Sequence, residues 1–381
     1  MFLNFLVPGL YNLQGGIQAY SRLLLEAIRQ VVPPESLRLV SMHDTEALLA
    51  PLRAEGVDCT GFGGEGKLAA QAKFSRHVFS LASSDESAAL NWTTHLNFSP
   101  LCAWSDRRQR MPFVCSAHGI EAWKIQSAVK RRALCQADLI VPVSEFTRDA
   151  MMLDLDLPAE RFRVLHNTFH EAEFVLAEKT AFLLAKYGLS PTTPVILTVA
   201  RLDASEQYKG YEQVVRALPG ILSAFPKARY ILAGQGNDAG RIRTLAASMG
   251  VGHALITPGF VGQEELPAHY SLCDVFVMPS KKEGFGIVFL EALACGKPVV
   301  AGNKDASVNA LRDGALGLLV DPDDCRAVAD AVLSVLSRSS SHPLLFKPEE
   351  LRALAIRHFG VDRFRSSVRR LLEEYGLSVR I

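Results

Sequence analysis

The chain has 381 residues, of which 49% are hydrophobic and 21% charged, and its formal net charge is +1. This length exceeds the size at which one hydrophobic core keeps growing, so we expect two domains. The balanced charge excludes a global field that would attract nucleic acid, and the apolar content excludes long disordered regions.

The seven cysteines are scattered, odd in number and never spaced as Cys-x-x-Cys. This pattern favours reduced thiols in a cytoplasmic protein over a disulfide framework or a zinc site. The N-terminus lacks the basic start of a signal peptide, and no apolar run approaches the roughly 20 residues that span a bilayer. We therefore expect a cytoplasmic location, with at most peripheral membrane contact, and an accidental glycosylation sequon at Asn91.

The first half of the chain alternates short apolar runs with helical patterns, which is typical of parallel α/β architecture. The patterns predict strands at 2–7, 37–42, 113–116, 139–143 and 163–166, and helices at 16–30, 121–136 and 145–153. The mixed segment 167–193 ends in a proline-bracketed stretch that suits a linker.

The second half repeats the alternation more regularly. Strands are predicted near 195–200, 229–233, 254–257, 274–278, 298–301 and 317–320, with helices near 210–224, 239–249, 264–271, 286–295 and 324–337. This order predicts a second doubly wound sheet, whose ligands should bind beyond the carboxyl ends of its strands. An amphipathic helix is expected at 361–375, near the end of the chain.

The strongest motif runs from Glu283 to Glu291, directly after the predicted strand 274–278. Gly284 and Gly286 allow a tight turn into a helix, and the free amides at a helix N-terminus are a natural seat for phosphate. Glu291 falls roughly 7–8 Å along that helix at 1.5 Å per residue, where a carboxylate would reach the ribose of a bound nucleotide. The alternative is a helix with two incidental glutamates.

Two further elements follow strands of the same sheet. Arg201 and Lys209 stand after the strand 195–200, where two cations would neutralise a diphosphate, or are simply solvated charges. Gly234 opens a glycine loop after the next strand, although glycines after strands are common turn residues.

These elements together resemble the C-terminal domain of the large retaining glycosyltransferase family, family 4, that contains bacterial mannosyltransferases and sucrose synthases. The resemblance is continuous from Val195 to Asp324. It implies a GT-B fold with two Rossmann-like domains facing across a cleft: an acceptor domain at 1–180, a nucleotide-sugar domain at 181–358, and a C-terminal helix at 359–381 crossing back to the first domain. Asn309 departs from the family pattern, which has glutamate there.

The resemblance also implies roles for individual residues. Arg201 and Lys209 would bind the diphosphate, Glu291 the ribose and Glu283 the donor sugar. The donor site would be completed by Gly16, Gly234, Phe285, Gly286, Ile287 and Val288.

In the N-terminal half, His118 ends the strand 113–116 and is the candidate that the family would place beside the donor sugar. Taken alone, a histidine at this point is more often structural. Gly16, after the first strand, would let the backbone approach the donor phosphates, or is a plain turn residue. Ser144 and Asn167 end neighbouring predicted strands.

Basic residues gather between Arg107 and Arg132, interleaved with Trp104 and Trp123. The cations of this stretch are Arg107, Arg108, Arg110, Lys124, Lys130, Arg131 and Arg132. They form solvated helix faces or contact an anionic membrane or a lipid-linked acceptor.

No cluster of His, Asp or Glu has metal-ligand spacing, so we expect a metal-independent reaction without cofactor, in which His118, Arg201, Lys209 and Glu283 are catalytic. The predicted function is retaining transfer of a hexose, in the first instance from GDP-mannose, to a saccharide or lipid-linked saccharide in cell-surface polysaccharide synthesis. The alternatives are a UDP-hexose donor, a nucleotide-sugar epimerase of the same fold, or a non-catalytic sugar-nucleotide-binding protein.

Overall fold

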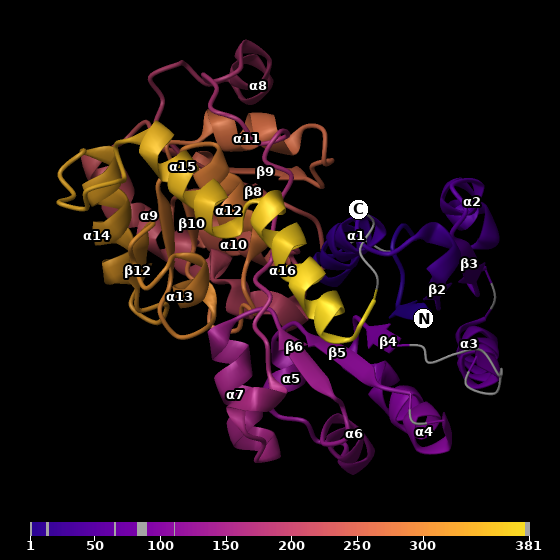
Figure 1. The fold of residues 1–381 in the computed structure, drawn as a ribbon. Helices are drawn as coiled ribbons and strands as arrows, with labels where there is room; N and C mark the ends of the chain where they lie inside the picture. The colour runs from indigo at the N-terminus through magenta and orange to yellow at the C-terminus, as the bar shows by residue number, and fades with distance from the viewer. Residues whose placement is uncertain (1, 13–14, 65, 82–89, 110, 378–381) are drawn as a thin grey trace. The chain divides into compact units, whose positions relative to one another are not determined.

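The computed structural model describes residues 2–12, 15–64, 66–81, 90–109 and 111–377, with the backbone alone at 105–109. Contacts within the chain divide it into two units, one formed by Met1–Thr168 with Asp362–Ile381 and the other by Phe169–Val361. Each unit contains one six-stranded parallel sheet flanked by helices (Figure 1).

The sheet of the first unit has the strand order β3-β2-β1-β4-β5-β6. Its strands are β1 (Leu3–Val7), β2 (Leu37–Ser41), β3 (Asp58–Gly61), β4 (Leu90–Thr93), β5 (Phe113–Ala117) and β6 (Leu139–Pro142). Its helices include α1 (Gly16–Arg29), α2 (Glu46–Ala54), α3 (Lys67–Leu81), α4 (Ser99–Gln109), α5 (Ile120–Trp123), α6 (Ala128–Leu134), α7 (Glu145–Leu155) and the C-terminal α16 (Val361–Glu374). All residues of β1, β4, β5 and β6 are buried, as expected for strands covered on both faces.

The sheet of the second unit has the order β12-β11-β10-β7-β8-β9. Its strands are β7 (Val195–Val199), β8 (Arg229–Ala233), β9 (Leu255–Gly259), β10 (Val275–Met278), β11 (Val299–Gly302) and β12 (Leu318–Val320). Its helices include α8 (Ala181–Tyr187), α9 (Tyr211–Ala224), α10 (Ala239–Ser248), α11 (Leu266–Leu272), α12 (Ile287–Ala294), α13 (Ser307–Ala310), α14 (Cys325–Leu336) and α15 (Pro348–Phe359).

Both sheets have the strand order 3-2-1-4-5-6 when each is numbered from its own first strand. In this arrangement the chain reverses its direction of winding between strands 1 and 4, and the loops at that point separate to leave a crevice for ligands. The switch point lies between β1 and β4 in the first unit and between β7 and β10 in the second.

The structure corrects two predicted elements. The expected strand at 163–166 is irregular: Arg163 and Leu165 donate backbone hydrogen bonds to Ile140 and Pro142 of β6, but no ladder forms. Pro142 has no N–H to donate in return, which ends the pairing.

The expected helix at 121–136 is two helices, α5 and α6. The backbone of Lys124 is extended, and the Ser127 side chain accepts a hydrogen bond from the N–H of Lys130 and caps α6. Serine competes for backbone groups in this way at helix starts, which is why one continuous helix does not form.

The sequence patterns missed two strands, β3 and β4. β4 contains Asn91, whose side chain is buried, so the sequon is inaccessible in the folded chain.

No helix among the described residues is long and apolar enough to cross a membrane.

Candidate functional site

The site of the second unit lies at the carboxyl ends of β7 and β10, its switch point. Here the Lys209 ammonium and the Glu283 carboxylate form an ion pair, with side chains only 19% and 15% exposed. Burial alone lowers the pKa of Lys209, but the Glu283 carboxylate outweighs it and the net pKa is raised. The structure therefore holds a charged lysine against a carboxylate at the point where the family resemblance predicts a diphosphate beside a sugar.

Arg201 follows β7 and is also paired with a carboxylate. Its guanidinium lies 3.0 Å from Glu206, and its side chain is 56% exposed. Glu206 was not singled out from the sequence because nothing in its local pattern distinguishes it from a surface glutamate. The Glu206 carboxylate therefore orients the Arg201 guanidinium from within the same loop.

Glycines allow the strand-end loops of this unit to pack backbone against backbone. A Cβ added at Gly234 would lie 1.8 Å from the Ala200 carbonyl, and one at Gly210 would lie 2.2 Å from the Pro279 carbonyl. Gly210 also has a φ of 83°, which disfavours other residues. Gly234 thus holds the loop of Arg201 close to β8, and Gly210 holds the Lys209 loop against the segment that leads to Glu283.

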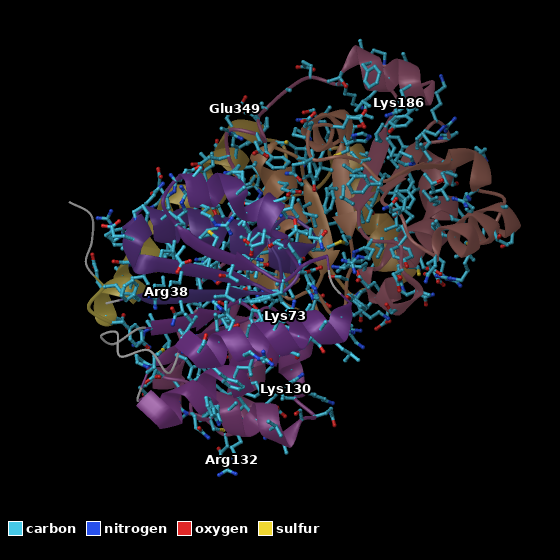
Figure 2. All side chains as sticks on the ribbon, turned by 90° about the vertical axis from the view of Figure 1, so that its right-hand side faces the viewer. Arg38, Lys73, Lys130, Arg132, Lys186 and Glu349 are labelled. Carbon is cyan, nitrogen blue, oxygen red and sulfur yellow. The ribbon has the colours of Figure 1, made fainter. Side chains whose placement is uncertain are left out.

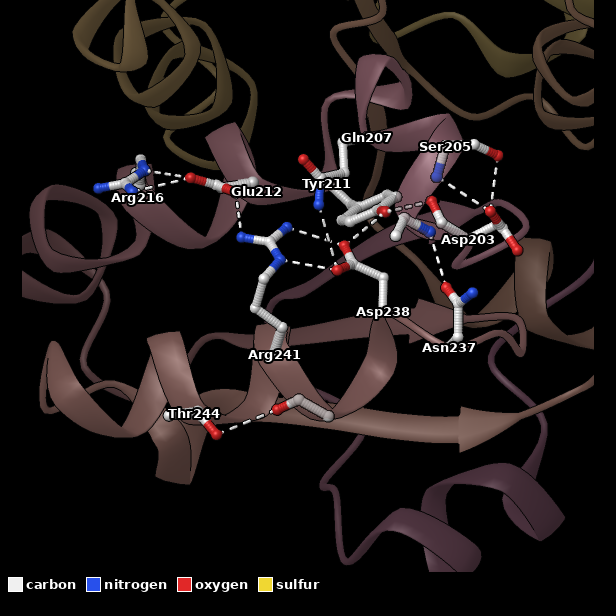
Figure 3. Close-up of polar contacts among 12 residues, drawn as sticks. Asp203, Ser205, Gln207, Tyr211, Glu212, Arg216, Asn237, Asp238, Arg241 and Thr244 are labelled. Carbon is white, nitrogen blue, oxygen red and sulfur yellow. Dashed lines mark hydrogen bonds and ion pairs between the residues drawn. The ribbon is translucent and has the colours of Figure 1, made fainter.

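A polar network supports the segment between Arg201 and Lys209 (Figure 3). The buried Asp238 carboxylate accepts hydrogen bonds from the Tyr211 hydroxyl at 2.8 Å and from Arg241 at 2.7 and 2.8 Å. These bonds, those of Arg241 first, hold the pKa of Asp238 below its usual value. Because Gln207 also donates to Asp238 and Tyr211 to the Asp203 carbonyl, the network fixes the segment between Arg201 and Lys209.

The loop from β10 to α12 carries the second half of the motif. Gly286 has a φ of 90°, and a Cβ there would lie 2.4 Å from the Phe289 ring, so the turn requires glycine. Phe285 is buried, while Ile287 and Val288 are half-buried in the first turn of α12. The Phe289 N–H donates to the Gly286 carbonyl at 3.0 Å, whereas the amides of Ile287 and Val288 precede any acceptor of the helix, which suits an anion.

Asp305, on the loop after β11, positions Glu283. Its buried carboxylate accepts hydrogen bonds from the Glu283 N–H at 2.6 Å and the Ser280 hydroxyl at 2.7 Å. The N–H of Ala306 in turn donates to the Glu283 carbonyl at 3.1 Å. The segment in which Asn309 departs from the family pattern thus supports the motif through Asp305, a residue that sequence analysis did not identify.

Glu291 lies on α12, buried beneath the site. The Tyr270 hydroxyl donates to one of its carboxylate oxygens at 2.6 Å. Burial raises the pKa of Glu291 to about 7, against the opposing effect of the Tyr270 hydrogen bond. The residue predicted to hold a ribose is therefore a carboxyl group whose neutral form is favoured by burial and which a tyrosine keeps in orientation.

In the first unit, His118 follows β5, and its ring packs edge-on against Tyr20 with centroids 4.8 Å apart. Its Nε2 lies 2.8 Å from the Thr94 carbonyl, an acceptor, so Nε2 must carry the proton. Burial lowers the pKa of His118, which favours the neutral ring. Nδ1 then has a lone pair and can accept a hydrogen bond from a hydroxyl group.

The loop after β1 precedes Gly16 and is fixed by Asp44. The buried Asp44 carboxylate accepts hydrogen bonds from the N–H groups of Leu10, Tyr11 and Asn12 at 2.6, 2.8 and 2.8 Å. A Cβ added at Gly16 would meet no atom of the described residues within 4 Å. Packing within the unit therefore does not explain the glycine at 16.

Two other residues at the ends of strands differ in character. The Ser144 hydroxyl accepts a hydrogen bond from the Thr147 N–H at 3.1 Å and caps α7, which is a structural role. His95 follows β4 at the switch point, and its Nδ1 accepts a hydrogen bond from the Asn97 N–H at 3.1 Å. Its position beside the strand of His118 was missed because β4 itself was not predicted.

Comparison with known proteins agrees with this architecture. Residues 180–347 match the sequence family described as "Glycosyl transferases group 1", and residues 91–172 match "Glycosyltransferase Family 4". The chain belongs to the family 4 GT-B glycosyltransferases. The family and the fold predicted from the sequence are thereby confirmed.

Among the similar members is the GDP-mannose-dependent alpha-(1-6)-phosphatidylinositol monomannoside mannosyltransferase of Mycolicibacterium smegmatis, 32% identical over 266 residues, or 66% of each chain. The alpha-D-kanosaminyltransferase of Streptomyces kanamyceticus is 29% identical over 211 residues, 54% of this chain and 53% of that one. The matched segments thus span less than two thirds of either relative.

Solved structures share the fold over nearly the whole chain. HepE of Anabaena in complex with UDP has a TM-score of 0.79 at 20% identity, with 98% of this chain and 100% of that chain covered. Sucrose-phosphate synthase of Thermosynechococcus elongatus has a TM-score of 0.75 at 19% identity, with 98% and 99% covered. At these identities the likeness establishes the fold.

Proposed function

We propose that the protein is a retaining, metal-independent hexosyltransferase that uses GDP-mannose as donor. The observation that carries the proposal is the meeting of Arg201, Lys209, Glu283 and the start of α12 at the β7–β10 switch point. Cations and free amides at one place suit a diphosphate, and a carboxylate beside them suits the sugar. The mannosyltransferase relative supports the choice of donor.

In this proposal Lys209 and Arg201 neutralise the charge that develops on the departing nucleoside diphosphate, with the amides of Ile287 and Val288. The acceptor hydroxyl attacks the anomeric carbon as the bond to the diphosphate breaks, and a leaving-group oxygen takes the hydroxyl proton. Glu283 stabilises the positive charge on the sugar. Nδ1 of His118 accepts a hydrogen bond from a hydroxyl of the donor sugar, and the backbone at Gly16 contributes to the phosphate site.

The acceptor is proposed to be a saccharide or a lipid-linked saccharide, reached at an anionic membrane surface. On α6 and α7 of the first unit, Val129 and Leu153 are 65% and 88% exposed. Lys124, Lys130 and Arg132 lie on or just before α6, and Figure 2 shows Arg132 extending from the ribbon. Exposed apolar groups among cations are typical of helices that lie on anionic lipid.

Two other members of the basic stretch, Arg131 and Trp123, contribute less to this surface. Arg131 is bonded to Asp154 at 2.6 Å, and Trp123 is half-buried with its indole N–H on Thr147. Trp104 is 40% exposed. Arg110 lies outside the described residues, as do the side chains of Arg107 and Arg108.

A thermal-shift series with GDP, UDP and ADP tests the donor, because a ligand that binds only the folded state raises its stability, by about 2.7 kcal/mol at a hundredfold excess over Kd. We expect GDP to give the largest shift, and GDP-mannose to be consumed only when an acceptor is present. A larger shift with UDP would replace GDP-mannose by a UDP-hexose. Donor turnover without acceptor would indicate an epimerase, and tight binding without turnover a binding protein.

A further inference from the structure

A cavity of about 770 Å³ lies in the second unit, away from the donor site. Its lining includes Pro194, Asp274 and Pro298, which immediately precede β7, β10 and β11. The cavity is therefore at the amino edge of the sheet, whereas Arg201, Lys209 and Glu283 are at the carboxyl edge. Its volume is within the range of about 300–1,000 Å³ that is typical of small-ligand sites.

The wall is part apolar and part polar. Its apolar side chains come from the linker, the end of α9, α14 and the segment before α15, among them Leu176, Pro191, Phe225, Leu336, Leu345 and Phe346. These apolar side chains suit the hydrocarbon or aromatic body of a ligand, and the polar part of the wall suits a charged group on the same ligand.

The charged side chains of the cavity are unequally satisfied. Lys179 is paired with Asp274 at 2.7 Å, and Asp274 also accepts a hydrogen bond from the Val195 N–H. The other two acidic side chains, Glu178 and Glu349, are exposed, and Figure 2 shows Glu349 at the surface. The acids thus either neutralise Lys179 or face solvent.

Lys297 and Arg338 are the remaining cations of the lining. The Lys297 ammonium donates to the Ser271 carbonyl at 2.8 Å, and the Arg338 guanidinium lies over the Phe346 ring at 4.7 Å. Neither is in an ion pair with any described carboxylate. Both are held in place by uncharged groups and keep N–H donors for an anion.

The two thiols of the lining, those of Cys273 and Cys295, have a different role. Cys273 and Cys295 line the cavity and are buried, and burial raises the pKa of each to about 12. They are therefore neutral and unreactive near pH 7, because the thiolate is the nucleophile. The Cys273 thiol instead donates a hydrogen bond to the Tyr270 carbonyl at 3.3 Å. The lining of the cavity is thus bonded to the residue that orients Glu291.

The lining also includes the residues that follow α12. Cys295, Gly296 and Lys297 directly follow Ala294, the last residue of this helix, and its first residue, Ile287, lies at the proposed donor site. Eight residues at 1.5 Å each separate the two places by roughly 12 Å, so ligands at both can be bound at once.

We propose that this cavity is a second ligand site, for a small organic anion with an apolar body and one phosphate or carboxylate group. Lys297 and Arg338 bind the anionic group, and the apolar side chains of the wall bind the body. The inference is independent of the donor and acceptor proposed above.

Calorimetry with phenyl phosphate as the probe tests the proposal, with inorganic phosphate and phenol as the two halves of its chemistry. We expect phenyl phosphate to bind more tightly than either half, and binding to persist with saturating GDP or UDP. Lys297→Gln and Arg338→Asn should each weaken it about tenfold, the effect of one charge-assisted hydrogen bond. Asparagine is chosen because residue 338 has a φ of 54°, which asparagine tolerates.

Lys227→Gln is the matched control, since Lys227 is an exposed lysine of the same unit outside the cavity. Its affinity for phenyl phosphate should equal that of the wild type, and all three variants should keep wild-type nucleotide affinity. Competition between phenyl phosphate and nucleotide, equal affinity in all variants, or binding no tighter than that of inorganic phosphate would each overturn the site. Failure of every nucleotide to bind would overturn the proposed function and leave this result standing.

Discussion

Glu283 and Glu291 begin and end one motif but occupy different surroundings. Glu283 is paired with Lys209 at the edge of the sheet, whereas Glu291 is buried with Tyr270. If Glu291 holds the ribose, its contact is made alike in the ground state and the transition state, and its loss weakens binding. If Glu283 faces the sugar, its contact strengthens as charge develops, and its loss slows turnover.

We therefore predict that Glu283→Gln lowers kcat by about 10²–10³-fold, as for other electrostatic stabilisers, with little change in the affinity for nucleoside diphosphate. Glu291→Gln should chiefly weaken nucleotide binding. Calorimetry with the nucleotide and steady-state kinetics on both variants measure the two effects. The reverse pattern would show that the two glutamates have been assigned to the wrong parts of the donor.

The pKa of Glu291 makes the stability of the fold depend on pH. Because burial raises this pKa from 4.5 to about 7, the folded state binds more protons than the unfolded state between these values. The contribution of Glu291 to the free energy of unfolding is therefore greatest below pH 4.5 and decreases as pH rises to about 7, by an amount on the order of 3 kcal/mol.

Glu291→Gln keeps an acceptor for the Tyr270 hydroxyl and removes the titration. We predict that the free energy of unfolding of this variant, relative to wild type, increases between pH 5 and pH 7.5. Denaturant unfolding at several pH values measures the difference. A difference that does not vary with pH would mean that Glu291 titrates near its ordinary pKa.

At the scale of elements, glycines set the spacing of the strand-end loops. Gly210 and Gly188 both end helical turns with positive φ, 83° and 64°. A Cβ at Gly188 would meet nothing within 4 Å, while one at Gly210 would lie 2.2 Å from the Pro279 carbonyl. The two positions therefore share the cost of a left-handed backbone and differ in the clash.

Gly188→Ala should lower the free energy of unfolding by about 1–2 kcal/mol, the cost of a left-handed conformation. Gly210→Ala should cost more, and it should also weaken nucleotide binding because Lys209 moves with the loop. Denaturant unfolding and calorimetry on both variants test this. Equal stability losses with unchanged nucleotide affinity would show that the Pro279 backbone moves away from the added Cβ without a cost in stability or binding.

The elements also show what the sequence could predict. Continuous apolar runs such as 195–200 and 139–143 identify buried parallel strands directly, because both faces are covered. β4 escaped because Asn91 interrupts its pattern, and the asparagine is tolerated through a buried hydrogen bond with Asn4 at 2.9 Å. Such pairing across strands is not visible in one segment of sequence.

The site was predictable to a similar extent. Arg201, Lys209 and Glu283 follow strands that can be recognised, and the fold brings them together at the switch point. Asp305 and Asp238, which position these loops, are set by tertiary contacts with residues distant in the chain. Support of this kind has no local signature, so sequence patterns find the groups at the site more readily than those that hold them.

The donor-site elements together predict catalysis without a divalent cation. If Arg201, Lys209 and the start of α12 bind the diphosphate as proposed, they supply the positive charge that Mg²⁺ would otherwise provide there. Transfer should therefore retain its full rate after treatment with EDTA and dialysis. Loss of activity that Mg²⁺ or Mn²⁺ restores would contradict the role given to the two cations.

At the scale of the whole molecule, the net charge of +1 is too small to attract an anionic membrane by itself. Among the described residues, we expect the attraction to come from the local excess of cations on and beside α6, where Val129 is exposed, and we expect the exposed Leu153 of α7 to add to it. Such an attraction is electrostatic at long range and decays within about 8–10 Å in physiological salt.

We predict that the protein binds vesicles containing anionic phospholipid, and that binding decreases as salt is raised. Basic residues near an anionic surface contribute about 1 kcal/mol each, so Lys124→Gln, Lys130→Gln and Arg132→Gln combined should weaken binding at least tenfold. The matched control combines Lys67→Gln, Lys73→Gln and Arg76→Gln, which removes three exposed cations of α3 in the same unit and should retain most of the binding. Vesicle sedimentation compares the two variants at equal net charge. Equal losses of vesicle binding in the two variants would indicate that the overall charge of the protein causes the attraction. Negligible binding of the wild type would mean that these cations are solvated helix faces. The acceptor would then have to be sought among water-soluble saccharides.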